Sequence, residues 1–319
     1  MMRVLPAIIA ALALASPAAA QKFPERAVRI VVPFAPGGGV DTFARMIAQR
    51  LQDRFGSPVI VENRAGANAT VGGAHVMQAA PDGHTLLFSA STHISARLVM
   101  SKAPYDPVAD FTPIARVGSA PMLLVMPPGK PQQTLAEAAA AAKQNPSEWT
   151  AATAALGSPG HLAMIAFADL AGFKPTIVPY RGTAPALNDV AGGHVQLYFD
   201  AMIALLPMVQ SGGIKALAIT SPVRSPLAPE IPTSAESGMA GLNIHSWYAF
   251  WGPKGMPVEL VRQLHDLVTE TTEQLARENK LEALGIDAVA ESTDEFARFQ
   301  DAEVARNAAL LKSVDFVPN

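Results

Sequence analysis

The chain has 319 residues, a formal net charge of −3 and no cysteine. Without cysteine, disulfides, Cys-ligated metal sites and cysteine nucleophiles are excluded. No cluster of Lys or Arg stands out among the 24 basic residues, so the sequence lacks the electrostatic footprint of nucleic-acid binding. A hydrophobic content of 50% with Gly and Pro punctuation indicates a compact core.

Residues 1–20 are typical of a secretory signal peptide. Arg3 supplies the positive charge, and the apolar run Val4–Leu14 is too short to cross a bilayer. Ala18–Ala20 matches the small-residue cleavage pattern. We therefore expect a mature, soluble chain that begins at Gln21 and resides in the periplasm.

Strand and helix patterns alternate in the first part of the mature chain. Helical spacing of Phe43, Ile47, Leu51 and Phe55 predicts an amphipathic helix that starts near Asp41. The order is βαβαβ, which is typical of a parallel sheet covered by helices. Strands are expected at 27–34, 58–62 and 85–89, and a second helix at 71–79.

The same alternation restarts after residue 121. Strands are expected at 122–126, 150–154, 176–180, 195–199, 215–220 and 243–252, and helices at 134–145, 257–278 and 293–313. The two C-terminal helices have no sheet of their own, so we expect them to return to the first unit. The prediction is an α/β chain of two domains with a cleft between them: domain I at 21–125 plus 246–319, and domain II at 126–245. Crossings, and therefore hinges, are expected near 121–127 and 243–248.

The junction after the first strand is the first candidate site, because open α/β sheets bind ligands beyond the carboxyl ends of their strands. Glycines allow a close approach of backbone to ligand, and a helix start attracts an anion. An ordinary turn with Asp41 as the N-cap of the helix is the alternative. The candidate residues are Phe34, Pro36, Gly37, Gly38, Gly39 and Asp41.

Other strand-to-helix junctions carry small, donor-rich residues. Arg181 has the fork geometry for a carboxylate, although a surface role is the alternative. Asp200 follows a strand and is expected to hold a loop or to bond a ligand amine or hydroxyl. The further candidates are Ser89, Ser91, Thr92, Gly157, Ser158, His161, Tyr180, Arg181, Gly182, Thr183 and Asp200.

An enzyme is the alternative reading. Ser158, His161 and Asp200 are the residue types of a nucleophilic triad, but no G-x-S-x-G elbow accompanies them. The seven histidines show no metal-ligand spacing. These observations favour a binding protein over a hydrolase, and we expect no metal site. A periplasmic hydrolase, or a receptor that signals to a sensor kinase, remains the alternative.

Seven stretches cover the mature chain in order: VPFAPGGGVD (32–41), VIVENRAGA (59–67), AAPDGHTLL (79–87), YDPVADFTPIA (105–115), VPYRGTAPALNDVAGGHVQLYFD (178–200), KALAITSPVRSPLAPEIPT (215–233) and LEALGI (281–286). Together they resemble the Bug family, the solute receptors of tripartite tricarboxylate transporters. The resemblance implies a two-domain Venus-flytrap fold, no catalysis and no cofactor. It also implies an organic-acid ligand, membrane transporter subunits as partners and binding loops at the junctions named above. We expect a monomer.

The loop at 153–161 departs from the family pattern S-x-G-x-G-T-S-x-H. Ala155 and Leu156 offer no side-chain donor, and Pro159 has no backbone N–H. A second carboxylate placed there would be poorly solvated. We therefore expect a carboxylate ligand with an apolar or aromatic body, unless Leu156 points into the domain core.

Overall fold

The computed structural model describes residues 23–319, so the predicted signal peptide lies outside the described residues. Within residues 23–319, ten strands form one sheet in the order β2-β1-β3-β9-β4-β7-β5-β6, with β8 and β10 paired to β4. The strands are β1 (Val28–Val32), β2 (Val59–Asn63), β3 (Thr85–Ala90), β4 (Phe111–Met126), β5 (Thr150–Thr153), β6 (Thr176–Pro179), β7 (Leu197–Ala201), β8 (Lys215–Ile219), β9 (His245–Pro253) and β10 (Asp287–Ala288).

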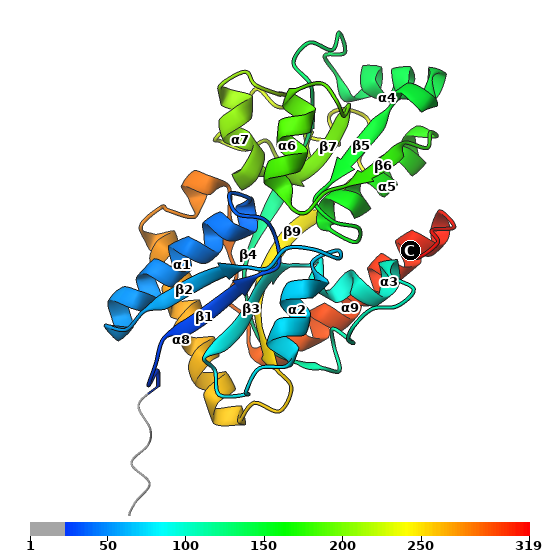
Figure 1. Cartoon of the computed structure of the whole chain (residues 1–319). Helices are drawn as coiled ribbons and strands as arrows, with labels where there is room; N and C mark the ends of the chain where they lie inside the picture. Colours follow the sequence, from blue (N-terminus) through cyan, green and yellow to red (C-terminus); the bar gives the residue numbers. More distant parts are fainter. Residues whose placement is uncertain (1–22) are drawn as a thin grey trace, which may run out of the picture.

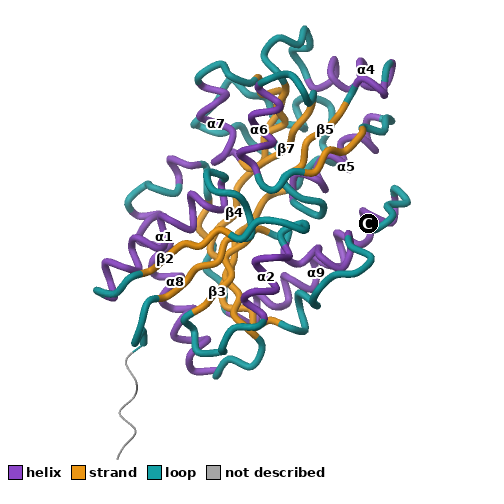
Figure 2. Tube along the Cα trace, in the orientation of Figure 1, coloured by secondary structure: helices purple, strands orange, loops and turns teal. Residues whose placement is uncertain are grey.

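Helices cover both parts of this sheet (Figures 1 and 2). No helix in the described part of the chain is both long enough and apolar enough to cross a membrane. The helices are α1 (Gly39–Phe55), α2 (Thr70–Met77), α3 (Ala96–Val99), α4 (Leu135–Gln144), α5 (Pro159–Ala171), α6 (Thr183–Ala191), α7 (Met202–Gln210), α8 (Val258–Arg277) and α9 (Thr293–Ser313).

The sheet and its helices form two α/β domains. Domain I is built on β1, β2, β3, β9 and the first part of β4, and domain II on β5, β6, β7, β8 and the end of β4. Parallel pairs β1–β2 and β1–β3 form the predicted βαβαβ unit. Parallel pairs β5–β6 and β5–β7 form its counterpart in domain II.

Strand β4 joins the two domains. Its first part pairs with β9 as far as Pro121, and from Met122 it pairs with β7 instead. The sequence predicted only its end, 122–126, because Pro113, Arg116 and Gly118 interrupt the apolar pattern. The structure accommodates these residues with register shifts at 113/115 and 116/118, as β-bulges do.

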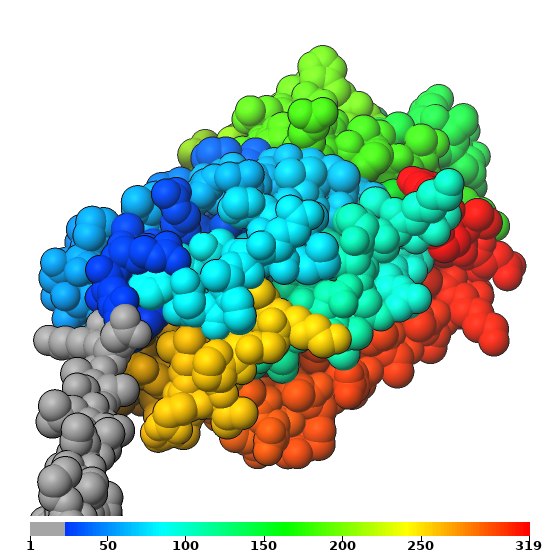
Figure 3. Space-filling view, turned by 60° about the horizontal axis from the view of Figure 1, so that its bottom comes forward, coloured from blue at the N-terminus to red at the C-terminus, as the bar shows by residue number. Residues whose placement is uncertain are grey.

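Apolar faces of the predicted helices form the two cores. In α1, Phe43, Ile47 and Leu51 are buried as their spacing predicted, and Phe43 packs edge-on against Phe88 of β3. The C-terminal helix α8 packs against α1 and β4 in domain I. Helix α9 also lies in domain I, but its end reaches α5 of domain II. In Figure 3 this red C-terminal segment lies against green residues of domain II.

Candidate functional site

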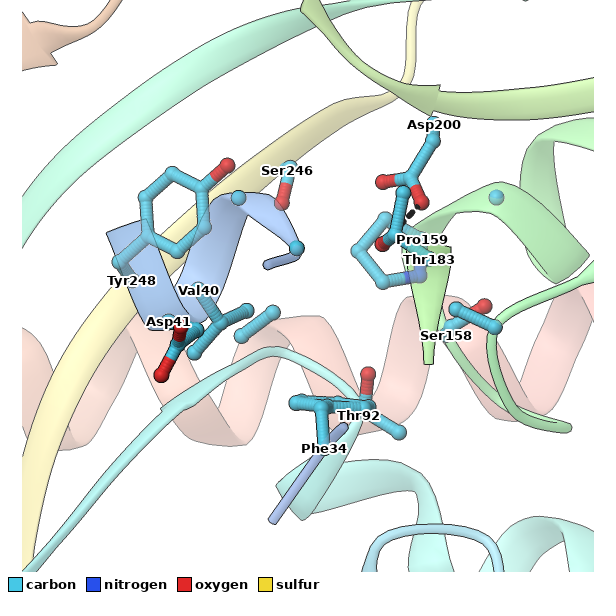
Figure 4. Close-up of a pocket in the computed structure, with 15 residues that line it drawn as sticks. Phe34, Val40, Asp41, Thr92, Ser158, Pro159, Thr183, Asp200, Ser246 and Tyr248 are labelled. Atoms are coloured by element: carbon cyan, nitrogen blue, oxygen red, sulfur yellow. Dashed lines mark hydrogen bonds between the residues drawn. The ribbon is translucent and has the colours of Figure 1, made fainter. Parts of the chain in front are cut away.

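A small cavity lies where the two domains meet (Figure 4). Its volume of about 30 Å³ is close to the space that one water molecule takes up in the liquid. Domain I contributes the start of α1 and parts of β3 and β9, and domain II contributes the starts of α5 and α6 and the end of β7. The lining residues are Phe34, Gly38, Gly39, Val40, Asp41, Ala90, Thr92, Ala154, Ser158, Pro159, Gly160, Thr183, Asp200, Ser246 and Tyr248.

Helix α1 begins earlier than the sequence predicted. Its N-cap is Gly38 and not Asp41, because the glycines allow the helical turn to start at Gly39. Asp41 therefore sits in the first turn and accepts hydrogen bonds from Gly37 N (3.0 Å), Arg45 Nε (3.0 Å) and Asn63 Nδ2 (2.8 Å). No side chain caps the helix at Gly38, so its first amides remain available to an anion.

Asp41 is held as a carboxylate. Burial opposes its ionisation, but the hydrogen bonds from Arg45, Gly37 and Asn63 and the charge of Arg45 outweigh this and lower its pKa. The carboxylate secures the backbone at Gly37, one residue before the helix cap. Asp41 thus shapes the glycine loop at the cavity.

Domain II places two more helix starts at the cavity. Ser158 caps α5 by accepting from His161 N at 3.2 Å. Helix α6 begins at Thr183 after Gly182, whose φ of 132° favours glycine. The positive ends of α1, α5 and α6 therefore surround the same space, and each favours an anionic group.

Asp200 lies on the domain II side, and its two oxygens are bonded within that domain. Oδ2 accepts from the hydroxyls of Tyr198 and, at 2.7 Å, Thr183, and Oδ1 accepts from Ala201 N at 2.7 Å. Burial raises the pKa of Asp200, and these three donors oppose that rise. Asp200 thus fixes the hydroxyl of Thr183, which it faces across the dashed bond of Figure 4.

Two buried hydroxyls at the cavity lack a partner. Within residues 23–319, neither Thr92 Oγ1 nor Tyr248 Oη has a hydrogen-bond partner. Both residues line the cavity from domain I. Because a buried hydroxyl without a partner is costly, these two groups are candidate ligand contacts.

The structure divides the candidate residues into two sets. Those that line the cavity are Phe34, Gly38, Gly39, Asp41, Thr92, Ser158, Thr183 and Asp200. Those that lie outside its lining are Pro36, Gly37, Ser89, Ser91, Gly157, His161, Tyr180, Arg181 and Gly182. Two of the second set make other hydrogen bonds. Tyr180 donates to Asp189 Oδ2 at 2.5 Å within domain II. The carbonyl of Arg181 accepts from Ala35 N at 2.9 Å, and this bond joins the two domains. The Arg181 side chain is exposed.

Seven lining residues are not among the candidates chosen from the sequence: Val40, Ala90, Ala154, Pro159, Gly160, Ser246 and Tyr248. Three of them, Val40, Pro159 and Gly160, lie within the predicted binding loops. Ser246 and Tyr248 lie two apart on β9 and line the cavity, whereas Trp247 between them donates to Glu303 of α9 at 3.1 Å. Strand alternation puts Ser246 and Tyr248 on one face of β9, but it does not show which face is toward the cavity.

Leu156 does not line the cavity. It is buried in an apolar cluster with Val99, Leu162 and Leu311. Leu156 packs between the domains, so it does not contact a ligand in the cavity. It therefore gives no support to an apolar ligand. Ala154 and Pro159 of the same loop do line the cavity.

Ser158, His161 and Asp200 do not form a catalytic triad. Ser158 Oγ is bonded to His161 only through the backbone N–H, and His161 Nδ1 accepts from Gly157 N at 3.1 Å. Burial lowers the pKa of His161 to about 4, so its ring is neutral. Among residues 23–319, no group of three or more His, Asp or Glu is placed to hold a metal ion.

Several known proteins are similar to this chain over most of its length. Protein BugT of Bordetella pertussis is 35% identical over 306 residues, which cover 95% of this chain and 94% of BugT. A Rhodopseudomonas palustris protein solved with adipate is 33% identical with a TM-score of 0.89, covering 93% of this chain and 100% of that one. MatC of the same organism, solved with malate, is 32% identical with a TM-score of 0.86, covering 91% and 100%.

The two solved structures share the fold of this chain. The family profile described as the tripartite tricarboxylate transporter family receptor, TctC, matches residues 43–316. The match begins within α1 and ends three residues before Asn319, so it includes both domains. The chain therefore belongs to the TctC family of tripartite tricarboxylate transporter receptors, the Bug-type solute-binding proteins.

Proposed function

We propose that this protein captures a small organic carboxylate between its two domains in the periplasm and delivers it to a tripartite tricarboxylate transporter. The convergence of the α1, α5 and α6 starts on one cavity is the observation that carries the proposal. Helix starts from both domains can bind one anion only when the domains are together. Binding and closure are therefore coupled.

The site residues of this proposal are the lining residues that offer donors. The backbone at Gly38 and Gly39 holds one carboxylate, and the hydroxyls of Thr92, Tyr248 and Ser158 contact the rest of the ligand. Two similar receptors were solved with adipate and malate, which supports a carboxylate in this chain.

The ligand body is proposed to be apolar. Phe34, Val40, Ala90, Ala154 and Pro159 present carbon atoms to the cavity. Burying such surface stabilises a methylene chain or ring by about 25 cal/mol per Å². At the start of α5, Pro159 has no backbone N–H, which removes one donor that an additional carboxylate of a compact acid such as citrate would need.

Ligand entry requires the domains to separate, since a cavity of about 30 Å³ is far smaller than a typical ligand pocket, roughly 300–1,000 Å³. We propose hinges at the two connections where the chain passes between domains, near residues 121–127 and 243–248. We propose domain limits of 21–125 plus 246–319 for domain I and 126–245 for domain II. Export through residues 1–20 and a monomeric receptor complete the proposal.

A thermal-shift screen tests the ligand class. A compound that binds only the folded protein stabilises it by RT ln(1 + [L]/Kd), about 2.7 kcal/mol at a hundredfold excess over Kd. We expect saturable stabilisation by adipate or an aromatic dicarboxylate, less by citrate, and no turnover of the compound. The proposal is wrong if no carboxylate in the screen stabilises the protein.

The transporter partnership needs its own test. Cells that carry the membrane subunits should take up the labelled carboxylate only when this receptor is present. A Gly38→Val receptor, which is expected not to bind, is the matched control. Equal uptake with both receptors would contradict delivery by this protein.

A further inference from the structure

One side chain of domain I bonds directly to the domain II loop that carries Ser158. Asn68 Oδ1 accepts from Leu156 N at 3.2 Å. Asn68 lies in the loop between β2 and α2, and Leu156 lies two residues before the Ser158 cap of α5. The bond therefore connects the edge of domain I to a wall of the cavity.

The backbone around Asn68 is strained. Ala67, Asn68 and Ala69 have φ values of 45°, 53° and 68°, three consecutive residues in the left-handed region. Asn tolerates this region, but an alanine there is destabilised by its Cβ. Such strain persists only when neighbouring contacts maintain it, and it concentrates at functional segments.

Contacts beneath the loop maintain its conformation. Thr70 bonds to the carbonyl of Ala67 twice, from Oγ1 at 2.6 Å and from N at 3.1 Å. Ala69 is buried in the core of domain I and is the N-cap of α2. Ala67 and Ala69 are thus fixed on each side of Asn68, whose side chain is directed at domain II.

The domain II loop meets domain I at further points. Gly157 has a φ of 76°, and a Cβ built on it would lie 2.7 Å from Ser95 Cβ. Leu156 packs against Val99 and Leu311 of domain I. The loop thus fits closely against domain I. Its backbone also donates a hydrogen bond to domain I, from Leu156 N to Asn68 Oδ1.

We propose that Asn68 is a positioning residue that holds the 154–158 loop against domain I, maintains the closed arrangement and slows ligand release. The inference rests on the proposed closure of the two domains. Separation of the domains breaks the Asn68–Leu156 bond, so the bond stabilises the closed form alone. A bond that forms only in the closed form raises the population of that form whether or not ligand is present.

Asn68→Gly tests the proposal without harming the fold. Glycine adopts a φ of 53° freely, so only the acceptor is lost. Asn279→Gly is the matched control, because Asn279 is an exposed asparagine with a φ of 58° in domain I. Asn68→Asp keeps an acceptor and tolerates the same backbone, so it should behave as the wild type in domain closure.

Domain closure can be measured with a pair of spin labels. The chain has no cysteine, so Ile60→Cys and Leu170→Cys place one label on an exposed position of each domain. Without added ligand, we expect part of the protein to show a short distance between the two labels, which represents the closed form. Asn68→Gly should reduce this population, whereas Asn279→Gly and Asn68→Asp should retain it. Adipate dissociation should be about tenfold faster from Asn68→Gly, and association should be no slower, because the ligand enters the open form.

Two results would overturn the proposal. One is a distance distribution that Asn68→Gly leaves unchanged, and the other is a wild-type protein with no short-distance population before ligand is added. Neither result depends on the identity of the ligand. If no carboxylate binds, the proposed function fails, but the label distances still decide the role of Asn68.

Discussion

Gly38 of domain I lies directly against Thr183 of domain II. A Cβ built on Gly38 would lie 3.2 Å from both Cβ and Oγ1 of Thr183. The same threonine hydroxyl donates to Asp200 at 2.7 Å, so it cannot turn away without losing that bond. The closed cavity therefore depends on the absence of a side chain at position 38.

Gly38→Val should prevent closure and abolish binding. The backbone at Gly38, with φ −86° and ψ 172°, suits valine, so the fold and its melting temperature should change little. We expect affinity for the ligand found by thermal shift to fall at least about a hundredfold, since the added methyl groups displace Thr183. Calorimetry against Gly129→Val, a glycine with nothing within 4 Å of its Cβ position, provides the control. Normal affinity in a folded Gly38→Val protein would contradict the prediction.

Tyr248→Phe should separate stability from binding. Tyr248 Oη is buried and has no hydrogen-bond partner in the described part of the chain, so its removal should leave the free energy of unfolding equal or raise it by up to about 1 kcal/mol. A ligand that bonds to this hydroxyl should bind about tenfold more weakly. Urea unfolding and calorimetry on the same samples measure both effects. A loss of stability with unchanged affinity would show that the hydroxyl serves the fold.

Asp41→Asn should destabilise the glycine loop. Asp41 accepts three hydrogen bonds, one of them from Arg45, so its change should lower the free energy of unfolding by about 2 kcal/mol at neutral pH. These bonds lower the pKa of Asp41 below 3.8. A lowered carboxyl pKa stabilises the fold above the unfolded value, and this is lost only as the pH falls through the folded value.

The difference between Asp41→Asn and the wild type should therefore persist from pH 7 to about pH 4. Urea titrations at these two pH values check it. Asp53→Asn, at the far end of the same helix, is the control for a change of charge alone. A difference that vanishes by about pH 5 would mean that Asp41 is protonated more readily than its contacts indicate.

Local patterns predicted the elements that carry the first half of the site. The apolar run before Pro33 and the spacing of Phe43 and Ile47 predict β1 and α1 and place the glycine loop between them. The predicted start of α1 was two residues late. The sequence does not show that Asp41 accepts from Gly37 N and does not cap the helix. Such choices depend on Arg45 and on Asn63 of the next strand, which also bond to the carboxylate.

Contacts between the domains could not be predicted in the same way. Leu156 and Arg181 both follow strands of domain II, where ligand residues are expected. The structure instead packs Leu156 against Val99 and uses only the carbonyl of Arg181. Which side chains face the cavity depends on how two separately patterned domains meet, and no periodicity within either domain encodes that arrangement.

His161 should make the fold sensitive to mild acid. Burial lowers its pKa from 6.5 to about 4. Gly157 N donates to Nδ1 at 3.1 Å, and the ring packs edge-to-face with Phe316 of domain I. Between these two pKa values the unfolded chain binds a proton that the folded chain does not. Stability from His161 is therefore complete above about pH 6.5 and falls as the pH drops toward 4.

The loss at about pH 5 should be about 2 kcal/mol from this residue. His161→Asn places an amide oxygen near the position of Nδ1 and cannot be protonated, so it should lose less stability between pH 7 and about pH 5 than the wild type does. His194 is exposed, so His194→Asn should lose as much stability between the two pH values as the wild type does. Urea unfolding of the three proteins at both pH values measures these losses. Equal losses in the wild type and His161→Asn would show that protonation of His161 does not destabilise the fold.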